Sequence, residues 1–142
     1  MAHKNSKKAR NRTSRQFPSA AHPEKIGEYD LLCKSGGGML YKEVLEYRVW
    51  DHGTDGDDEC YSFADYDEAQ RFSDDGEERE PPLVLVLQNP WLTWNESKHD
   101  YELIYEDRIA EWQVKWLTDE NKAKNAGSAI AKLRREKPDG WE

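Results

Sequence analysis

Residues 83–87 are five consecutive apolar residues, Leu-Val-Leu-Val-Leu, in a chain that is otherwise strongly polar. Pro81-Pro82 precede this run and Asn89-Pro90 follow it, so turn-forming residues bound it on both sides. A short apolar run between such boundaries is typical of a strand that is buried on both faces. We therefore expect the rest of the chain to pack around this strand.

A hairpin is predicted upstream of the apolar run. Within residues 39–50, every second side chain from Leu45 to Val49 is apolar, which predicts a half-buried strand. A turn rich in Asp and Gly follows, and residues 59–63 return as the partner strand. The side chains expected on the outer, polar face of the first strand are Glu46, Arg48 and Trp50.

Three further strands and two helices complete the prediction. The strands are expected at 29–33, 101–105 and 112–116, with a looser segment at 91–94. Asp65 is an expected helix N-cap, because Glu68 follows it by three residues in a capping-box pattern. The side chains of that helix expected to face the core are Tyr66, Ala69 and Phe72, and a second helix with a thin apolar stripe is expected at 119–135.

These elements predict an α+β fold with a mainly antiparallel sheet of about five or six strands and one packed helix. Its expected parts are a disordered basic arm at 1–23, an α+β domain at 24–117, and a C-terminal helix and tail at 118–142. The arm lacks the apolar residues that would offset the entropy of ordering it.

The distribution of charge also separates the arm at 1–23 from the rest of the chain. The net charge is −8, yet residues 1–23 contain no acidic residue, while 15 Lys/Arg and 29 Asp/Glu remain in residues 24–142, a net charge of −14. The arm is either a solvated tail or a weak, salt-sensitive contact to nucleic acid. Its candidate anion contacts are Lys4, Lys7, Lys8, Arg10, Arg12 and Arg15.

No motif identifies a reaction. The glycines Gly36, Gly37 and Gly38 precede a strand rather than a helix, so they predict a flexible loop and not a phosphate-binding loop. The acidic turn lacks the ligand spacing of an EF-hand, and no HExxH or CxxC pair occurs, so no metal site is predicted. Cys33 and Cys60 are expected to be reduced thiols in the cytoplasm, and no apolar run reaches the length of a membrane span.

Four blocks of sequence resemble a known group of proteins. They are DLLCKSGGGML (30–40), VLEYRVW (44–50), PLVLVLQ (82–88) and EDRIAEW (106–112). Together they resemble small bacterial proteins, many of them alphaproteobacterial, that are classified as GNAT-family N-acetyltransferases. The resemblance covers about residues 29–117 and implies acetyl-CoA as cofactor. That family binds the acetyl-CoA pyrophosphate through a Q/R-x-x-G-x-G/A loop; no segment here has that pattern, so no catalytic residue is assigned.

The residues favour a small interaction protein without a catalytic site or cofactor of its own. Its acidic body would present Trp50, Arg48 and Glu46 to a protein partner. An acetyl-CoA-dependent N-acetyltransferase of degenerate type is the alternative, and a nucleic-acid-associated protein that uses the basic arm is a second alternative. Whether the chain is an enzyme stays open at this point.

Overall fold

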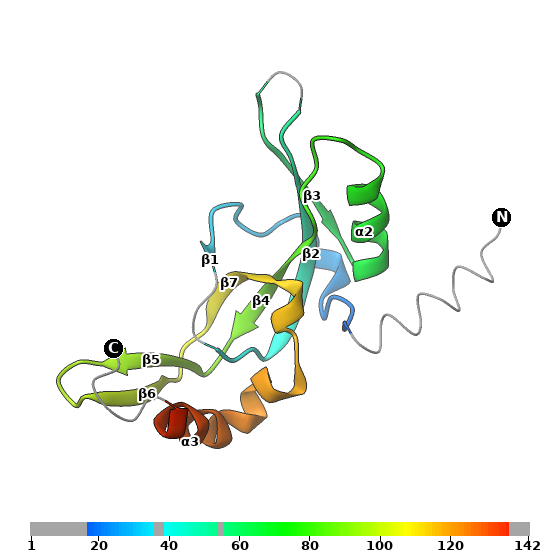
Figure 1. Cartoon of the computed structure of the whole chain (residues 1–142). Helices are drawn as coiled ribbons and strands as arrows, with labels where there is room; N and C mark the ends of the chain where they lie inside the picture. The colour runs from blue at the N-terminus through cyan, green and yellow to red at the C-terminus, as the bar shows by residue number, and fades with distance from the viewer. Residues whose placement is uncertain (1–16, 36–38, 54–55, 137–142) are drawn as a thin grey trace.

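The computed structural model describes residues 17–35, 39–53 and 56–136 (Figure 1). In these residues, seven strands form a five-stranded sheet of order β1-β7-β4-β2-β3 and a two-stranded sheet β5-β6. All neighbouring strands are antiparallel except β1 and β7, so the expected α+β class with a mainly antiparallel sheet is confirmed. The strands are β1 (Lys34–Ser35), β2 (Glu43–Asp51), β3 (Glu59–Phe63), β4 (Leu83–Gln88), β5 (Trp91–Asn95), β6 (Asp100–Ile104) and β7 (Arg108–Gln113).

The apolar run forms β4, the central strand of the larger sheet, as predicted. β4 pairs antiparallel with β2 on one side and with β7 on the other. Val84, Leu85 and Val86 have no exposed surface. Because successive side chains of a strand point to opposite faces, three buried residues in a row mean that both faces of the sheet are covered here.

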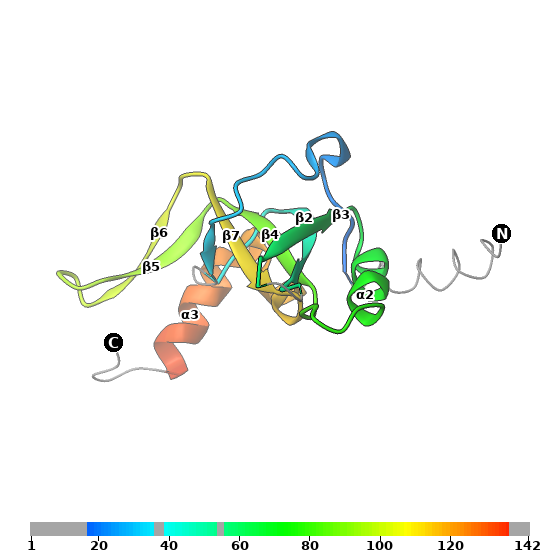
Figure 2. The ribbon, with the colours of Figure 1, turned by 90° about the horizontal axis from the view of Figure 1, so that it is seen from above.

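The hairpin of β2 and β3 is confirmed, but the prediction that β2 is half-buried was wrong. The pairing runs from Tyr47 opposite Phe63 to Asp51 opposite Glu59. All residues at 44–49 are buried, including the polar ones. The reason is that the segment at 26–33 crosses the face of the sheet that the alternation assigned to solvent (Figure 2).

Three other strand predictions need correction. Residues 29–33 are not a strand, because their carbonyls accept hydrogen bonds from a side chain below them; the neighbouring β1 pairs instead, with Lys34 opposite Ala110. The segment expected to be loose is β5, whose Trp94 lies opposite Tyr101 with ring centroids 5.1 Å apart. β7 begins at Arg108, earlier than predicted, and the chain then turns into the 3-10 helix η2 (Val114–Trp116).

The first helix, α2 (Tyr66–Asp74), forms where it was expected. Asp65 is its N-cap, and its carboxylate accepts a hydrogen bond of 2.9 Å from the backbone N–H of Glu68. Ala69 is buried against the sheet, and Tyr66 and Phe72 pack beside it. The sequence prediction of the cap and of the buried face is confirmed.

The second helix begins later than predicted. Residues 119–125 form two 3-10 turns, η3 (Asp119–Asn121) and η4 (Ala123–Asn125), before α3 (Ala126–Glu136). Lys122 between the two turns has an extended backbone, because the N–H groups of Tyr41 and Ala123 tie the segment to its neighbour through hydrogen bonds of 2.8 Å. This tertiary pairing prevents a continuous helix.

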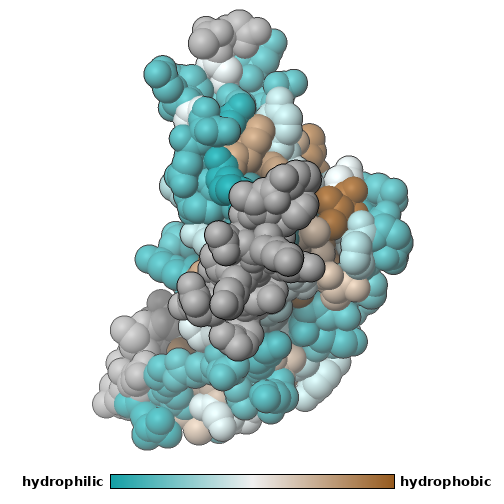
Figure 3. All heavy atoms as spheres, turned by 90° about the vertical axis from the view of Figure 1, so that its right-hand side faces the viewer, coloured by the Kyte–Doolittle hydropathy of each residue, from teal (hydrophilic) through white to brown (hydrophobic). Residues whose placement is uncertain are grey.

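The larger sheet separates two unlike layers (Figure 2). α2 and the segment at 114–117 cover an apolar face, and the segment at 26–33 covers a polar one. The β5–β6 hairpin extends away from the sheet with α3 beside it, whereas the face that carries α2 is mostly hydrophilic on its outside (Figures 1 and 3). The core residues on the apolar face include Tyr47, Val49, Val84, Val86, Ala110 and Trp112.

The last residues of the expected disordered arm are ordered. Residues 17–23 pack on the body: Ala20 donates a backbone hydrogen bond to Ala64, and Ala21 donates one to Val44, each 2.8 Å long. The ring of Phe17 lies 4.8 Å from that of Tyr66, measured between centroids. One aromatic side chain and a short run of small residues are therefore enough to order this segment, and the remaining residues 1–16 lie outside the described part of the chain.

Replacing Tyr47 by Phe should lower the free energy of unfolding by about 1 kcal/mol. The hydroxyl of Tyr47 donates a hydrogen bond to the carbonyl of Pro18, and the ring is fully buried. Urea unfolding measures the change. Tyr105 is 71% exposed, so Tyr105→Phe is the control and should have no effect; equal stability of both variants would contradict the assigned role of the Pro18 contact.

Candidate functional site

Glu46 and Arg48 lie in the interior and not on the surface where the sequence placed them. The side chains are 1% and 0% exposed, and the Nε of Arg48 lies 2.7 Å from Oε2 of Glu46. Burial lowers the pKa of Arg48, but the hydrogen bond and the charge of Glu46 raise it by more. The guanidinium therefore stays charged, and neither residue is available to a protein partner.

Arg48 connects three elements that are distant in sequence. Its Nη2 donates to the carbonyl of Asp30 at 2.6 Å, and its Nη1 lies 3.4 Å from both the carbonyl of Leu31 and a carboxylate oxygen of Glu111 on β7. Trp50, also expected on the outer face, is half-buried and donates its indole N–H to the same Glu111 oxygen at 3.1 Å. One cation thus fixes the segment before β1 to the sheet.

Glu46 completes this buried cluster. Its two carboxylate oxygens accept hydrogen bonds from the backbone N–H of Gly27 at 2.8 Å, from Arg48, and from the hydroxyl of Ser62 at 3.0 Å. A buried carboxylate is tolerated when a cation and further donors satisfy it. The cluster therefore holds the segment at 26–33 against the sheet at both of its ends.

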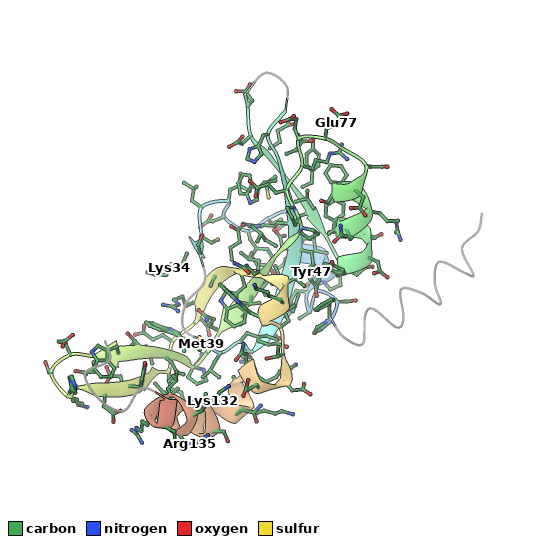
Figure 4. The ribbon with its side chains drawn as sticks, viewed as in Figure 1. Lys34, Met39, Tyr47, Glu77, Lys132 and Arg135 are labelled. Atoms are coloured by element: carbon green, nitrogen blue, oxygen red, sulfur yellow. The ribbon has the colours of Figure 1, made fainter. Side chains whose placement is uncertain are left out.

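The same segment presents apolar side chains to solvent. Leu32 is 94% exposed and Leu31 is 53% exposed, although their backbone is held from below. On the adjacent strand β7, Ile109 precedes Ala110, the residue in register with Lys34, and it is 36% exposed. We call Leu31, Leu32 and Ile109 the leucine surface. It lies at the β1 edge of the sheet, where Figure 4 shows Lys34.

The two cysteines border the buried cluster and are unreactive in character. Both are free thiols. Cys33 donates to the carbonyl of Asp30, and burial raises the pKa of its thiol despite the nearby Arg48. Burial likewise raises the pKa of Cys60 to about 11. The nucleophilic form of cysteine is the thiolate, so thiols with raised pKa values are poor nucleophiles at neutral pH.

Three carboxylates in and beside the acidic turn at the end of the β2–β3 hairpin are held by neighbouring groups. Asp51 accepts hydrogen bonds from the backbone N–H of Gly53 and from Arg79. Asp58 and Glu80 hold the two ring nitrogens of His52, at 2.8 and 2.6 Å. Among the described residues no group of three or more His, Cys, Asp or Glu side chains has the arrangement of a metal site.

This arrangement predicts a pH-dependent stability. The hydrogen bond to Asp58, and then the one to Glu80, raise the pKa of His52 above its ordinary value of about 6.5. A raised pKa means that the stabilisation is complete below about pH 6.5 and is lost as the pH rises through the folded-state pKa. The stability difference between wild type and His52→Asn should therefore shrink between about pH 6 and pH 9, as measured by urea unfolding. If the difference in stability stayed constant over this range, protonated His52 would not be stabilised by Asp58 and Glu80.

The other site residues expected from the sequence lie outside the described chain. These are the loop glycines Gly36, Gly37 and Gly38 and the six cations of residues 1–16. The leucine surface was missed, although a signal for it was present. Leu31 and Leu32 are adjacent, and a strand at 29–33 would have pointed one of them away from the core.

The chain matches no protein-family model, and the searches of curated proteins and of solved structures found no match. No described helix has the length and apolar composition of a transmembrane segment.

Proposed function

We propose that this chain is a protein-binding module without a catalytic site or cofactor of its own, and that its contact surface is the leucine surface. The observation that carries the proposal is the buried Arg48, which donates to the backbone beneath two exposed leucines. Single exposed leucines are ordinary on protein surfaces. Here, however, the buried pair of Glu46 and Arg48 holds the backbone of the segment that bears them.

A rigid backbone under exposed apolar side chains favours binding. A loop that becomes ordered on association loses conformational entropy, which weakens binding. A segment that is already held in place avoids this loss of entropy. A few residues near the centre of an interface commonly contribute about 2 kcal/mol or more each. The two free cysteines are compatible with a reducing compartment, and we place the protein in the cytoplasm.

The acetyl-CoA-dependent N-acetyltransferase remains the alternative, supported by the four blocks of sequence resemblance. The pairing of the central strands favours the binding module instead. β4 is hydrogen-bonded on both sides to antiparallel strands, and after Gln88 it continues through Asn89 and Pro90 into β5 rather than into a helix. Calorimetry separates the two functions: heat of binding at millimolar acetyl-CoA would favour the enzyme.

The binding proposal is tested by capture from a lysate of cells that naturally produce the protein, with immobilised wild-type chain at moderate salt. Leu32→Asp should reduce the affinity for a captured partner by about 30-fold, which corresponds to about 2 kcal/mol. Because Leu32 is 94% exposed, the variant should retain its fold. The matched control is Tyr105→Asp, since Tyr105 is 71% exposed and lies outside the leucine surface.

Comparison with the Tyr105→Asp control also shows which result would contradict the binding proposal. A partner captured equally by wild type, Leu32→Asp and Tyr105→Asp would show that the leucine surface is not the contact. Recovery of no partner by the wild-type chain would count against a binding module altogether.

A further inference from the structure

An open pocket of about 530 Å³ lies beside the segment that follows β7. Its lining combines apolar side chains, among them Phe17 and Leu117, with hydroxyl groups and two lysines. This volume is within the range of small-molecule sites, which pair an apolar lining with a few polar groups that orient the ligand. The leucine surface contributes no residue to the pocket.

Tyr41 contributes to this pocket a hydroxyl that has no protein partner. The residue is only 2% exposed, and its backbone and ring are engaged by Asn121, Ala123 and Trp112. Within the described part of the chain, however, no group accepts or donates a hydrogen bond at the hydroxyl. Burial, and then the charge of Asp119, raises the pKa of Tyr41, so the hydroxyl stays protonated and can donate. A polar group on a buried side chain needs a partner, and the pocket is where a ligand can supply one.

The two lysines of the pocket also lack a partner of opposite charge. Among the described residues, neither Lys115 nor Lys122 lies within ion-pair distance of an acidic group, whereas two cations of α3 are each paired with a carboxylate. The Nζ of Lys122 lies 5.1 Å from the centroid of the Tyr41 ring, so this cation is close to the residue with the unpaired hydroxyl. Asp119 is the one acidic side chain among the described lining residues, and the lining therefore carries a net positive charge on a protein that is acidic overall.

Thr118 adds a second hydroxyl donor. Its oxygen accepts a hydrogen bond of 3.3 Å from the backbone N–H of Asn121, which leaves the hydroxyl hydrogen for a ligand. The pocket thus offers two ammonium groups and two hydroxyls to an acceptor. A phosphomonoester carries a charge of about −1.5 to −2 at neutral pH and three acceptor oxygens, whereas a carboxylate has one charge and two oxygens. The donor set therefore suits a phosphomonoester better.

We propose that this pocket binds a small phosphomonoester that carries a flat apolar group, of about the size of a nucleoside monophosphate. Lys115 and Lys122 contact the phosphate, and the hydroxyls of Tyr41 and Thr118 donate hydrogen bonds to it. The flat group lies against the apolar part of the lining. Because the leucine surface lies outside the pocket, this ligand site stands or falls independently of the proposed protein partner.

Three related compounds test the ligand chemistry in calorimetric titrations of the full chain. Adenosine 5′-monophosphate should bind at least about tenfold more tightly than adenosine, which lacks the phosphate, and than ribose 5-phosphate, which lacks the flat ring. Equal binding of adenosine would show that the phosphate is not recognised, and equal binding of ribose 5-phosphate would show that the flat group is not. Either result would overturn the proposal, as would the absence of heat with both adenosine 5′-monophosphate and phenyl phosphate at millimolar concentration.

Variants of the lysines test the location of the site. The double variant Lys115→Gln with Lys122→Gln should weaken binding of adenosine 5′-monophosphate by about tenfold or more, because charge-assisted hydrogen bonds are lost. The charge-matched control is Lys34→Gln with Lys98→Gln, since neither residue lines the pocket, and it should leave the affinity unchanged. An unchanged affinity of the pocket variant, or an equal loss in the control, would overturn the assignment of the site.

Tyr41→Phe tests the unpaired hydroxyl with two readouts. Because the hydroxyl has no partner within the described chain, its removal should leave the free energy of unfolding of the free protein unchanged. It should nevertheless weaken binding of adenosine 5′-monophosphate by about two- to tenfold, the effect of one lost hydrogen bond. Unchanged affinity, with or without a loss of stability in urea unfolding, would overturn the assigned contact between Tyr41 and the phosphate.

Discussion

Replacing Arg48 by Met is expected to lower the free energy of unfolding by about 3–5 kcal/mol. The substitution retains an apolar stem of similar length and removes only the charge and its donors. Glu46, 1% exposed, would lose its cation in the interior, and the carbonyl of Asp30 would lose a hydrogen bond of 2.6 Å. Unfolding in guanidinium chloride measures the loss. The denaturant midpoint and the m-value are fitted separately.

The same substitution on the surface is the control. Arg134 makes a bidentate ion pair with Asp100, with N–O distances of 3.0 and 2.6 Å. Its side chain is 56% exposed, so Arg134→Met should change the free energy of unfolding by only about 0–1 kcal/mol. If Arg48→Met were as mild as Arg134→Met, the buried cluster would not be what holds the segment at 26–33. The partner affinity of Arg48→Met should also fall, because the leucines would lose their fixed backbone.

Replacing Trp112 by Ala is expected to lower the free energy of unfolding by about 3–5 kcal/mol. Trp112 is 1% exposed, and its ring meets those of Tyr41 and Trp116 edge to face, each with centroids 5.8 Å apart. It lies on β7 directly opposite Val84 of the central strand. The cavity left by the indole would open the apolar core between the sheet and the 3-10 turns, and thermal unfolding measures the effect.

Trp94 is the matched control for this substitution. It lies on the two-stranded β5–β6 sheet and is half-buried, so Trp94→Ala should cost less than half as much as Trp112→Ala. A similar loss for both variants would mean that the small sheet contributes as much to stability as the core of the larger one.

Local patterns predicted the elements whose stability comes from their own residues. The prolines around residues 83–87 and the apolar content of the run predicted β4 and its burial. The capping box at Asp65 predicted α2, because the cap satisfies backbone N–H groups within the same turn. The alternation in β2 also predicted its pairing with β3, since a short acidic turn connects them.

The polar face of β2 shows where such patterns fail. Alternation identifies which side chains share a face, but it does not reveal what covers that face. Here a segment from earlier in the chain covers it, and Glu46 and Arg48 became a buried pair because Asp30, Gly27 and Glu111 satisfy their remaining hydrogen bonds. Trp50 is half-buried for the same reason, and its indole N–H donates to Glu111 of this cluster.

The sequence by itself determined the central strand, the hairpin beside it, the capped helix and the separation of a basic arm from an acidic body, because each follows from neighbours in the chain or from composition. Only the tertiary structure decided which leucines face solvent and which lysines line a pocket. Both depend on contacts between residues far apart in sequence: Arg48 with the carbonyls of Asp30 and Leu31, and Phe17 with the segment that carries Lys115 and Lys122.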